Sequence, residues 1–252
     1  MAGILASIVC ALIGTFVVVN RMVSISGALA HISFGGIGLG YFLGVDPLAA
    51  AIPFSISSSL LIGFIQEKIQ QNSDVLIGIL WAVGMALGII FIHFSPGYAP
   101  DLMSYIFGNI LTVSSEQIAL LSILVLLIAI SIFVFYEKLK AISFDEQFAR
   151  ASGINVFAYR LILLALVSLS IIVLIKLVGV ILVIALLSIP SEISRRASSS
   201  LFGTIKLSIA ISLILTIGSL FISFWLDTPS GATIVIIMGA AYFLSLLIPQ
   251  KS

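Results

Sequence analysis

The sequence has few charged residues. Only 11 of its 252 residues are Lys or Arg and 10 are Asp or Glu, so that 8% of the chain is charged. A soluble domain carries about 25% charged residues, and the scarcity seen here excludes a water-soluble globule. Apolar residues make up 61% of the chain instead, and the mean hydropathy is +1.33. This composition is typical of an integral membrane protein.

Several functional signatures are also missing. The single cysteine, Cys10, has no second thiol in the chain with which to form a disulfide. The net charge of +1 and the lack of a basic cluster with interleaved aromatic residues exclude nucleic acid as a partner. The chain contains no Gly-x-Ser-x-Gly, no His-Glu-x-x-His and no Gly-rich loop ending in Lys-Ser or Lys-Thr. We therefore expect no catalytic residue and no permanently bound cofactor, and any ATP that is used binds to another subunit.

Apolar runs long enough to cross a bilayer follow one another along the chain. A helix needs about 20 residues to cross a hydrocarbon core of about 30 Å, and continuous rather than alternating runs favour helices over a barrel. The first run lacks the basic segment and the cleavage site of a signal peptide. The sequence therefore predicts an all-α, polytopic transmembrane helical bundle of about eight to nine spans, with residues 1–252 forming one domain. The expected spans are 2–19, 24–43, 48–65, 75–94, 117–136, 157–175, 177–193, 207–226 and 232–248.

Basic residues are distributed unevenly between the two sides of this predicted bundle. If the spans alternate in direction, all of the 11 Lys and Arg residues except Lys176 fall on one side. Such a bias marks the cytoplasmic side, so this side and the C-terminus are predicted to be cytoplasmic. Acidic residues of the opposite loops, such as Asp46 and Asp101, either attract cations or a basic partner, or are merely solvated. The segment 95–116, which contains several Gly and Pro residues, is expected to be an external loop with a short, partly buried helix.

Glycines recur every four residues in two of the predicted spans. Gly36, Gly40 and Gly44 follow this spacing in and just beyond the second span, and Gly84 and Gly88 follow it in the fourth. Small residues on one helix face let helices approach closely in lipid. The spacing predicts helix packing and does not identify a function.

Two histidines are the candidate metal-contacting residues. His31 lies within the second predicted span, where a neutral imidazole is a suitable ligand for zinc, copper, iron or nickel and a titratable residue is a functional candidate. The alternative is a histidine that makes a hydrogen bond between helices. His93, near the outer end of its span, is the weaker candidate. Glu192 is expected to pair with Arg195 or Arg196 rather than to face a substrate.

The most polar stretch of the chain lies between the fifth and sixth predicted spans, on the predicted cytoplasmic side. Ser143 and Glu146 fit a capping box and Gly153 fits a helix end, so a short helix is predicted over residues 143–153. A helix of this length is marginal alone and needs a surface on which to dock.

The predicted helix is amphipathic. Phe144, Phe148 and Ala151 fall on one face, and the charged residues of the segment fall elsewhere. The docking surface is either the lipid interface or a groove on a partner protein.

Residues 144–153 read Phe-Asp-Glu-Gln-Phe-Ala-Arg-Ala-Ser-Gly. This segment resembles the coupling helix of permeases from ATP-binding-cassette importers of zinc, manganese and iron, in which a Phe-Asp-x-x-Phe-Ala-x-x-Gly pattern inserts into the ATPase; the spacing here is one residue longer. Stretches at 73–79, 107–111, 178–182, 189–190 and 229–234 resemble the same family in the same order. The resemblance implies a type II importer permease-like fold. It also implies ATPase-coupling roles for Phe144, Asp145, Glu146, Phe148, Ala149, Arg150 and Gly153.

The second predicted span departs from the family pattern at one position. The family usually carries Gly-Asp-Ala-Leu-x-His there, with the Asp and the His facing the translocation path, whereas residues 26–31 read Ser-Gly-Ala-Leu-Ala-His. Only His31 can be carried over, because Gly27 replaces the carboxylate. Manganese suits carboxylates and zinc suits imidazole. The substitution therefore favours zinc as the transported divalent ion, with manganese or iron as alternatives.

The resemblance further implies partners and a location. Two copies of the chain would form a homodimer in the plasma or inner membrane, two ATPase subunits would dock beneath them, and an extracytoplasmic metal-binding protein would deliver the ion. The chain would be a multi-pass transport subunit and not an enzyme. The alternatives are a permease for siderophores or cobalamin, a membrane-embedded enzyme, and a channel or structural subunit without ATP coupling.

Overall fold

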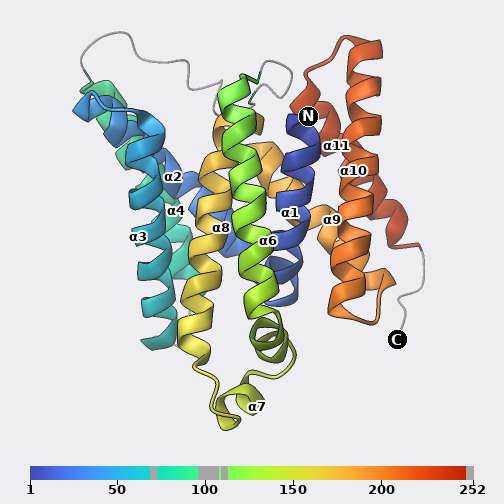
Figure 1. Cartoon of the computed structure of the whole chain (residues 1–252). Helices are drawn as coiled ribbons and strands as arrows, with labels where there is room; N and C mark the ends of the chain where they lie inside the picture. The colour runs from blue at the N-terminus through green and yellow to red at the C-terminus, as the bar shows by residue number, and fades with distance from the viewer. Residues whose placement is uncertain (69–72, 96–107, 109–112, 248–252) are drawn as a thin grey trace. The chain divides into compact units, whose positions relative to one another are not determined.

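The computed structural model describes residues 1–68, 73–95, 108 and 113–247. All regular secondary structure in these residues is helical (Figure 1). The helices are α1 (Ala2–Val19), α2 (Val23–Leu43), α3 (Pro47–Lys68), α4 (Ser73–His93), α6 (Ser115–Phe144), α7 (Glu146–Ala151), α8 (Val156–Val178), α9 (Val180–Ala197), α10 (Leu201–Leu226) and α11 (Ser230–Ser245). Most of the segment 95–116, including Asp101, lies outside the described residues, so the loop predicted there stays a prediction.

The described helices confirm an all-helical polytopic membrane protein. Seven of them, α1, α2, α3, α4, α6, α8 and α10, are long and apolar enough to cross a membrane. The two other helices expected to span fall short of this standard for different reasons. α9 carries Glu192, Arg195 and Arg196 near its C-terminal end, and α11 has 16 residues where about 20 are needed.

α6 is longer than the span predicted from its apolar residues. It covers 30 residues and ends at Phe144, whereas the predicted span ends at residue 136. The extension contains Glu, Lys, Leu and Ala, which are good helix formers regardless of hydropathy. The polar stretch therefore begins as a continuation of α6 and not as a loop.

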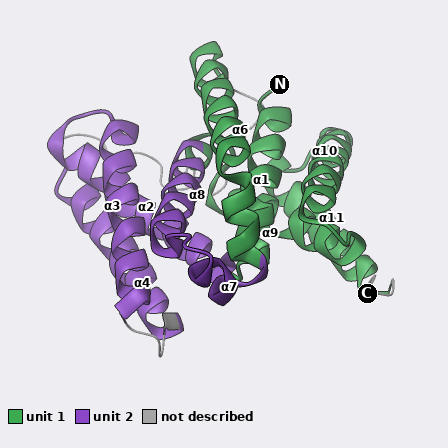
Figure 2. Ribbon diagram, turned by 60° about the horizontal axis from the view of Figure 1, so that its bottom comes forward, with its two compact units in different colours: residues 1–21, 103–143, 174–252 green, residues 22–102, 144–173 purple. Residues whose placement is uncertain are grey.

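The chain divides into two compact units, which are coloured separately in Figure 2. Unit 2 comprises Met22–Leu102 and Phe144–Val173, and it contains α2, α3, α4, α7 and most of α8. Within it, α2 packs against both α3 and α4. The Ser55 hydroxyl lies 2.8 Å from that of Ser33 and 2.8 Å from that of Ser168, and all three side chains are buried. These hydrogen bonds join α2, α3 and α8 at a depth where lipid offers no polar partner.

Glycines on α2 let α3 approach closely. A Cβ atom at Gly36 would lie 2.7 Å from Cα of Ala51, and one at Gly40 would lie 2.6 Å from Cα of Pro47. Real Cβ atoms do not come this close to a backbone, so both positions require the smallest residue. Gly44 differs from the packing prediction: it ends α2 with φ at 65°, and no atom lies within 4 Å of its Cβ position. Its role is to end the helix in a left-handed conformation.

Glycines on α4 play the same part toward α2. A Cβ atom at Gly84 would lie 2.7 Å from Cα of Ile32, and one at Gly88 would lie 2.6 Å from the carbonyl oxygen of Phe34. Because both neighbours are backbone atoms, they cannot move aside as a flexible side chain can. The contact between α2 and α4 is therefore made by backbones at close range.

Unit 1 comprises Met1–Arg21, Met103–Ser143 and Leu174–Ser252. In it, α1 packs against α9 and α10, and α11 packs against the same two helices. Ser7 on α1 donates a hydrogen bond to Thr216 on α10 at 3.0 Å, and the hydroxyls of Ser191 and Ser208 lie 3.0 Å apart. Buried hydroxyls follow α10 along its length, at Thr204, Ser208, Ser212, Thr216, Ser219 and Ser223. Short polar side chains thus mark the face of α10 that its neighbours cover.

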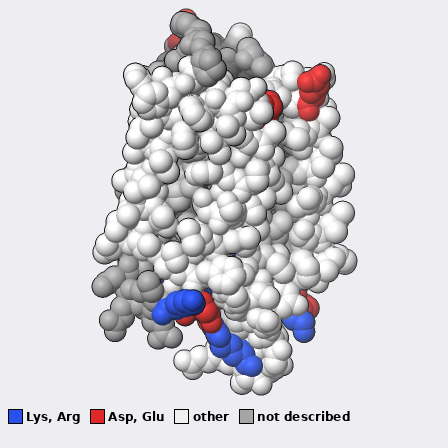
Figure 3. Space-filling model, turned by 90° about the vertical axis from the view of Figure 1, so that its left-hand side faces the viewer, with Lys and Arg blue, Asp and Glu red and all other residues white. Residues whose placement is uncertain are grey.

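On one face of the molecule, the exposed surface between the helix ends is uncharged (Figure 3). Figure 3 shows a face on which Lys, Arg, Asp and Glu lie near the two ends and a broad uncharged band lies between them. Large apolar side chains such as Leu126, Phe133 and Phe221 are more than half exposed. A surface of this kind is stable where lipid covers it.

Candidate functional site

An aspartate caps the start of α7. Asp145 has an extended backbone, and its side chain accepts a hydrogen bond from the backbone N–H of Phe148 at 2.9 Å. The predicted capping role of Ser143 is wrong, because Ser143 lies inside α6 and its hydroxyl donates to the carbonyl of Leu139 at 2.7 Å. A carboxylate at the N-cap satisfies a free backbone donor and also faces the positive end of the helix dipole.

A glycine follows the last turn of α7 and ends the helix, as the sequence predicts. Gly153 has φ at 80°, which is the left-handed conformation. Its N–H donates to the carbonyl of Arg150 at 3.1 Å, and the N–H of Ile154 donates to that of Ala149 at 3.0 Å. This pair of hydrogen bonds is the Schellman arrangement, which satisfies carbonyl groups of the last turn. α7 therefore has a defined start and a defined end despite its length of six residues.

Two aromatic side chains are exposed around the start of α7: Phe144, the last residue of α6, and Phe148 of α7 itself. Phe144 and Phe148 are each 66% exposed, whereas Ala149 is fully buried. Ala149 is the buried side chain of α7. An exposed pair of phenylalanines next to charged residues is typical of a surface that a partner covers.

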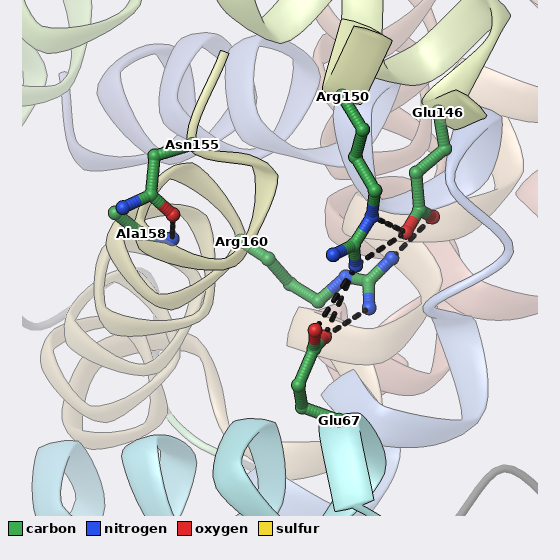
Figure 4. Close-up of polar contacts among 6 residues, drawn as sticks. All are labelled: Glu67, Glu146, Arg150, Asn155, Ala158 and Arg160. Atoms are coloured by element: carbon green, nitrogen blue, oxygen red, sulfur yellow. Dashed lines mark hydrogen bonds and ion pairs between the residues drawn. The ribbon is translucent and has the colours of Figure 1, made fainter. Parts of the chain in front are cut away.

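Four charged side chains from α3, α7 and α8 lie together (Figure 4). Arg150 donates to Glu67 at 3.1 Å and to Glu146 at 3.0 Å. Arg160 lies 2.5 Å from Glu146 and 3.6 Å from Glu67. Each carboxylate thus contacts both guanidinium groups, and we call Glu67, Glu146, Arg150 and Arg160 the charge ring.

The charge ring joins three helices of unit 2. Glu67 lies in the last turn of α3, Glu146 and Arg150 belong to α7, and Arg160 lies near the start of α8. Asn155, whose side chain accepts from the N–H of Ala158 at 3.1 Å, caps the start of α8. The pKa of the Arg150 guanidinium is raised, mainly by its hydrogen bond to Glu146 and next by its hydrogen bond to Glu67.

The His31 imidazole lies on α2 against two side chains of α4. Its Nδ1 atom is 3.2 Å from the Met85 sulfur. Its ring stacks on that of Trp81, with a centroid separation of 4.4 Å and an interplanar angle of 22°. The side chain is half-buried. The imidazole is therefore held in one orientation between a thioether and an indole.

Trp81 also covers Gly27. A Cβ atom at Gly27 would lie 3.3 Å from the Trp81 ring, so the indole borders the place that a side chain at this position would need. Among the described residues, no group of three or more His, Cys, Asp or Glu side chains is arranged to hold a metal ion. The described side chains that contact the His31 imidazole are thus a thioether and an indole.

The other candidates lie elsewhere. His93 is the last residue of α4, is exposed, and contacts the Phe94 ring edge-on at 5.2 Å. Glu192 accepts two hydrogen bonds from Arg195, at 2.7 and 2.8 Å, which confirms the predicted ion pair.

Sequence reasoning did not single out Glu67, Trp81 or Met85. Glu67 lies two residues beyond the predicted span 48–65, and its partner Arg150 is 83 residues away in the chain. Trp81 and Met85 stand four residues apart on α4, a spacing that places them on one helix face. This spacing predicts that the two side chains share a face, but it does not predict which neighbouring helix that face contacts.

The fold and the site define a class of protein: a polytopic helical membrane protein that carries a short, exposed amphipathic helix outside its apolar spans. A comparison with protein families identifies the class more closely. Residues 1–249 match the family described as the ABC 3 transport family. The chain belongs to this family of ABC transporter membrane subunits, and it is a non-catalytic permease.

Relatives agree with this assignment. The chain is 34% identical over 257 residues to the "Probable metal transport system membrane protein" of Chlamydia trachomatis, covering 100% of this chain and 88% of the relative. It is 30% identical to the manganese transport system membrane protein MntC of Listeria innocua, covering 100% and 89%. It is 28% identical to the high-affinity zinc uptake system membrane protein ZnuB of Haemophilus influenzae, covering 98% and 94%.

A solved structure has the same fold. The chain superposes with a TM-score of 0.87 on a chain of PsaBC from Streptococcus pneumoniae in complex with Fab, at 29% sequence identity. The match covers 98% of this chain and 89% of that one.

Proposed function

We propose that the chain is the permease subunit of an ATP-driven importer of divalent transition-metal ions, with zinc preferred over manganese and iron. ATP is hydrolysed by separate ATPase subunits, an extracytoplasmic metal-binding protein delivers the ion, and two copies of the chain form the path. The C-terminus and α7 lie on the cytoplasmic side. Membership of the ABC 3 transport family supports the class of function, and the names of relatives that transport manganese or zinc support a metal cargo.

The exposure of α7 is the observation that carries the coupling role. A capped helix that buries Ala149 and exposes Phe148, with Phe144 exposed just before it at the end of α6, is suited to enter a groove on another protein. ATP binding draws the two ATPase subunits together and pushes on α7. The push tilts the attached helices, so that the path opens in turn to the two sides of the membrane.

The surroundings of His31 support the choice of zinc. Manganese favours carboxylate and carbonyl oxygen, whereas imidazole suits zinc and thioethers suit softer metals than manganese. The described groups next to His31 are the Met85 sulfur and the Trp81 ring, and Gly27 provides no carboxylate. His31 then offers a transient ligand, weak enough for the ion to leave again.

Transport by the complete complex in liposomes tests the proposal. The permease is reconstituted with its ATPase and binding protein, and ATP-dependent uptake of zinc is measured with manganese or iron as competitor. We expect zinc uptake that requires hydrolysable ATP and that manganese inhibits only in excess. Uptake of manganese in preference to zinc would overturn the metal assignment and leave the class of transporter standing.

A further inference from the structure

α7 needs support beyond its own contacts. It has six residues, and Ala149 is its one buried side chain. A peptide of this length does not hold a helical shape or a position by itself. The charge ring supplies the missing support, because Arg150 and Glu146 of α7 bind Glu67 of α3 and Arg160 of α8.

The charge ring contributes more to the position of α7 than to the stability of the fold. Its side chains are between 26% and 46% exposed and line an open cavity of about 520 Å³ together with Gln66 and Gln147. Single ion pairs at such exposure add little to stability. The alternating ring, however, fixes the direction of each guanidinium, since each contacts two carboxylates at once.

Glu67 connects this ring to the helix that carries His31. It lies at the end of α3, and α3 is joined to α2 by the close approach at Gly36 and by the buried hydrogen bond between Ser33 and Ser55. Packed cores of this kind shift as units rather than deform. A displacement of α7 that reaches Glu67 therefore reaches His31 through α3 and α2.

We propose that Glu67 is a positioning residue, which ties α3 to α7 so that the two helices move as one body when the ATPase acts. The proposal rests on the coupling role of α7 proposed above. It assigns to the charge ring the step between the push on α7 and the movement of the helices around His31. Glu67 itself is proposed to touch neither the ATPase nor the ion.

The test compares three variants in the complete complex reconstituted in liposomes. Glu67→Gln removes the charge and keeps the shape, and Glu67→Asp keeps the charge with a shorter reach. Glu137→Gln is the matched control, because Glu137 forms a single long pair of 3.9 Å with Lys140 and is 77% exposed. Zinc moved per ATP hydrolysed is measured for each, together with the amount of ATPase that copurifies.

A second readout follows the position of α7 directly. Spin labels are attached at Lys68→Cys and Ser152→Cys, two exposed positions on α3 and next to α7, in a Cys10→Ser background. We expect one narrow distance distribution between the labels, with and without ATP, and a clearly broadened one when Glu67→Gln is added. Arg160→Gln removes the α8 member of the charge ring and must broaden the distance distribution as well. It replaces Glu67→Gln in this measurement if Glu67→Gln fails to accumulate.

The expected result is that Glu67→Gln keeps its ATPase and hydrolyses ATP but moves at least about fivefold less zinc per ATP. Glu67→Asp should lie between Glu67→Gln and the unmodified chain, and Glu137→Gln should match the unmodified chain. Normal transport per ATP by Glu67→Gln, or unchanged label distances, overturns the proposal. If the unmodified complex shows no ATP-driven uptake, the proposed function fails instead, and the label distances still decide whether the ring holds α7 to α3.

Discussion

The indole of Trp81 stacks on the imidazole of His31, with ring centroids 4.4 Å apart. The same indole borders the Cβ position of Gly27, one helical turn before His31. A bulky aromatic side chain therefore fills the space next to a position that has no side chain of its own. This arrangement distinguishes the surroundings of His31 from a pair of carboxylate and imidazole.

The first prediction concerns this arrangement. The double variant Gly27→Asp with Trp81→Ala creates a carboxylate one turn from His31 and makes room for it. Because carboxylates favour manganese, we expect the ratio of manganese to zinc uptake to rise by about tenfold, which corresponds to about 1.4 kcal/mol. Gly27→Asp alone should impair the transport of both ions, since its Cβ meets the Trp81 ring at 3.3 Å. An unchanged ratio in the double variant would mean that this position does not select the metal.

The second prediction concerns His31 itself. His31→Ala removes the imidazole that is proposed to contact the ion, and we expect ATP-dependent zinc uptake to fall by about tenfold or more. The ATPase should still copurify, because α7 is unaltered. Full transport by this variant would reduce His31 to a packing residue for Trp81 and Met85.

The third prediction concerns the outward face of α7. Phe148→Asp places a charge where an apolar ring is proposed to enter a groove of the ATPase, and loss of such an anchor costs about 2 kcal/mol or more of binding free energy. We expect the permease to reach the membrane in normal amount but to lose both ATPase binding and metal uptake. Phe148→Leu, which keeps an apolar side chain, is the control and should retain most uptake. Unchanged uptake by Phe148→Asp would remove the coupling assignment.

The fourth prediction uses two glycines of α4. Gly84→Ala drives a methyl group to within 2.7 Å of Cα of Ile32, whereas Gly78→Ala meets nothing within 4 Å. We expect Gly84→Ala to destabilise the fold by about 1–3 kcal/mol through overpacking. Gly78→Ala should be neutral or stabilise the helix by up to about 1 kcal/mol. Thermal unfolding of the detergent-solubilised protein measures both, and equal midpoints would contradict the close contact between α2 and α4.

The sequence predicted the helices well because apolar length and turn chemistry are local signals. The bounds of α2 and α3 and the left-handed Gly153 follow from residues within a few positions of each other. α6 was predicted too short, because Glu and Lys extend a helix past the end of its apolar run. The start of α7 was assigned to Ser143 rather than to Asp145, since both residues are good N-caps and only the path of α6 decides between them.

The site was less predictable, because its contacts depend on how helices pack. His31 stood out as a polar residue in an apolar span, but its neighbours Trp81 and Met85 lie on another helix. Glu67 could not be linked to Arg150 from spacing, since 83 residues separate them. The roles of the coupling residues and of His31 stay predictions until transport is measured.

Uptake by the permease with and without its ATPase shows whether transport through this subunit depends on ATP hydrolysis. Liposomes that contain the permease alone are compared with liposomes that contain the complete complex, with the same zinc gradient and internal ATP. We expect zinc uptake in the complete complex only, and its loss when ATP is replaced by a nonhydrolysable analogue. Equal zinc uptake by the permease alone would contradict the claim that α7 couples this membrane subunit to ATP hydrolysis.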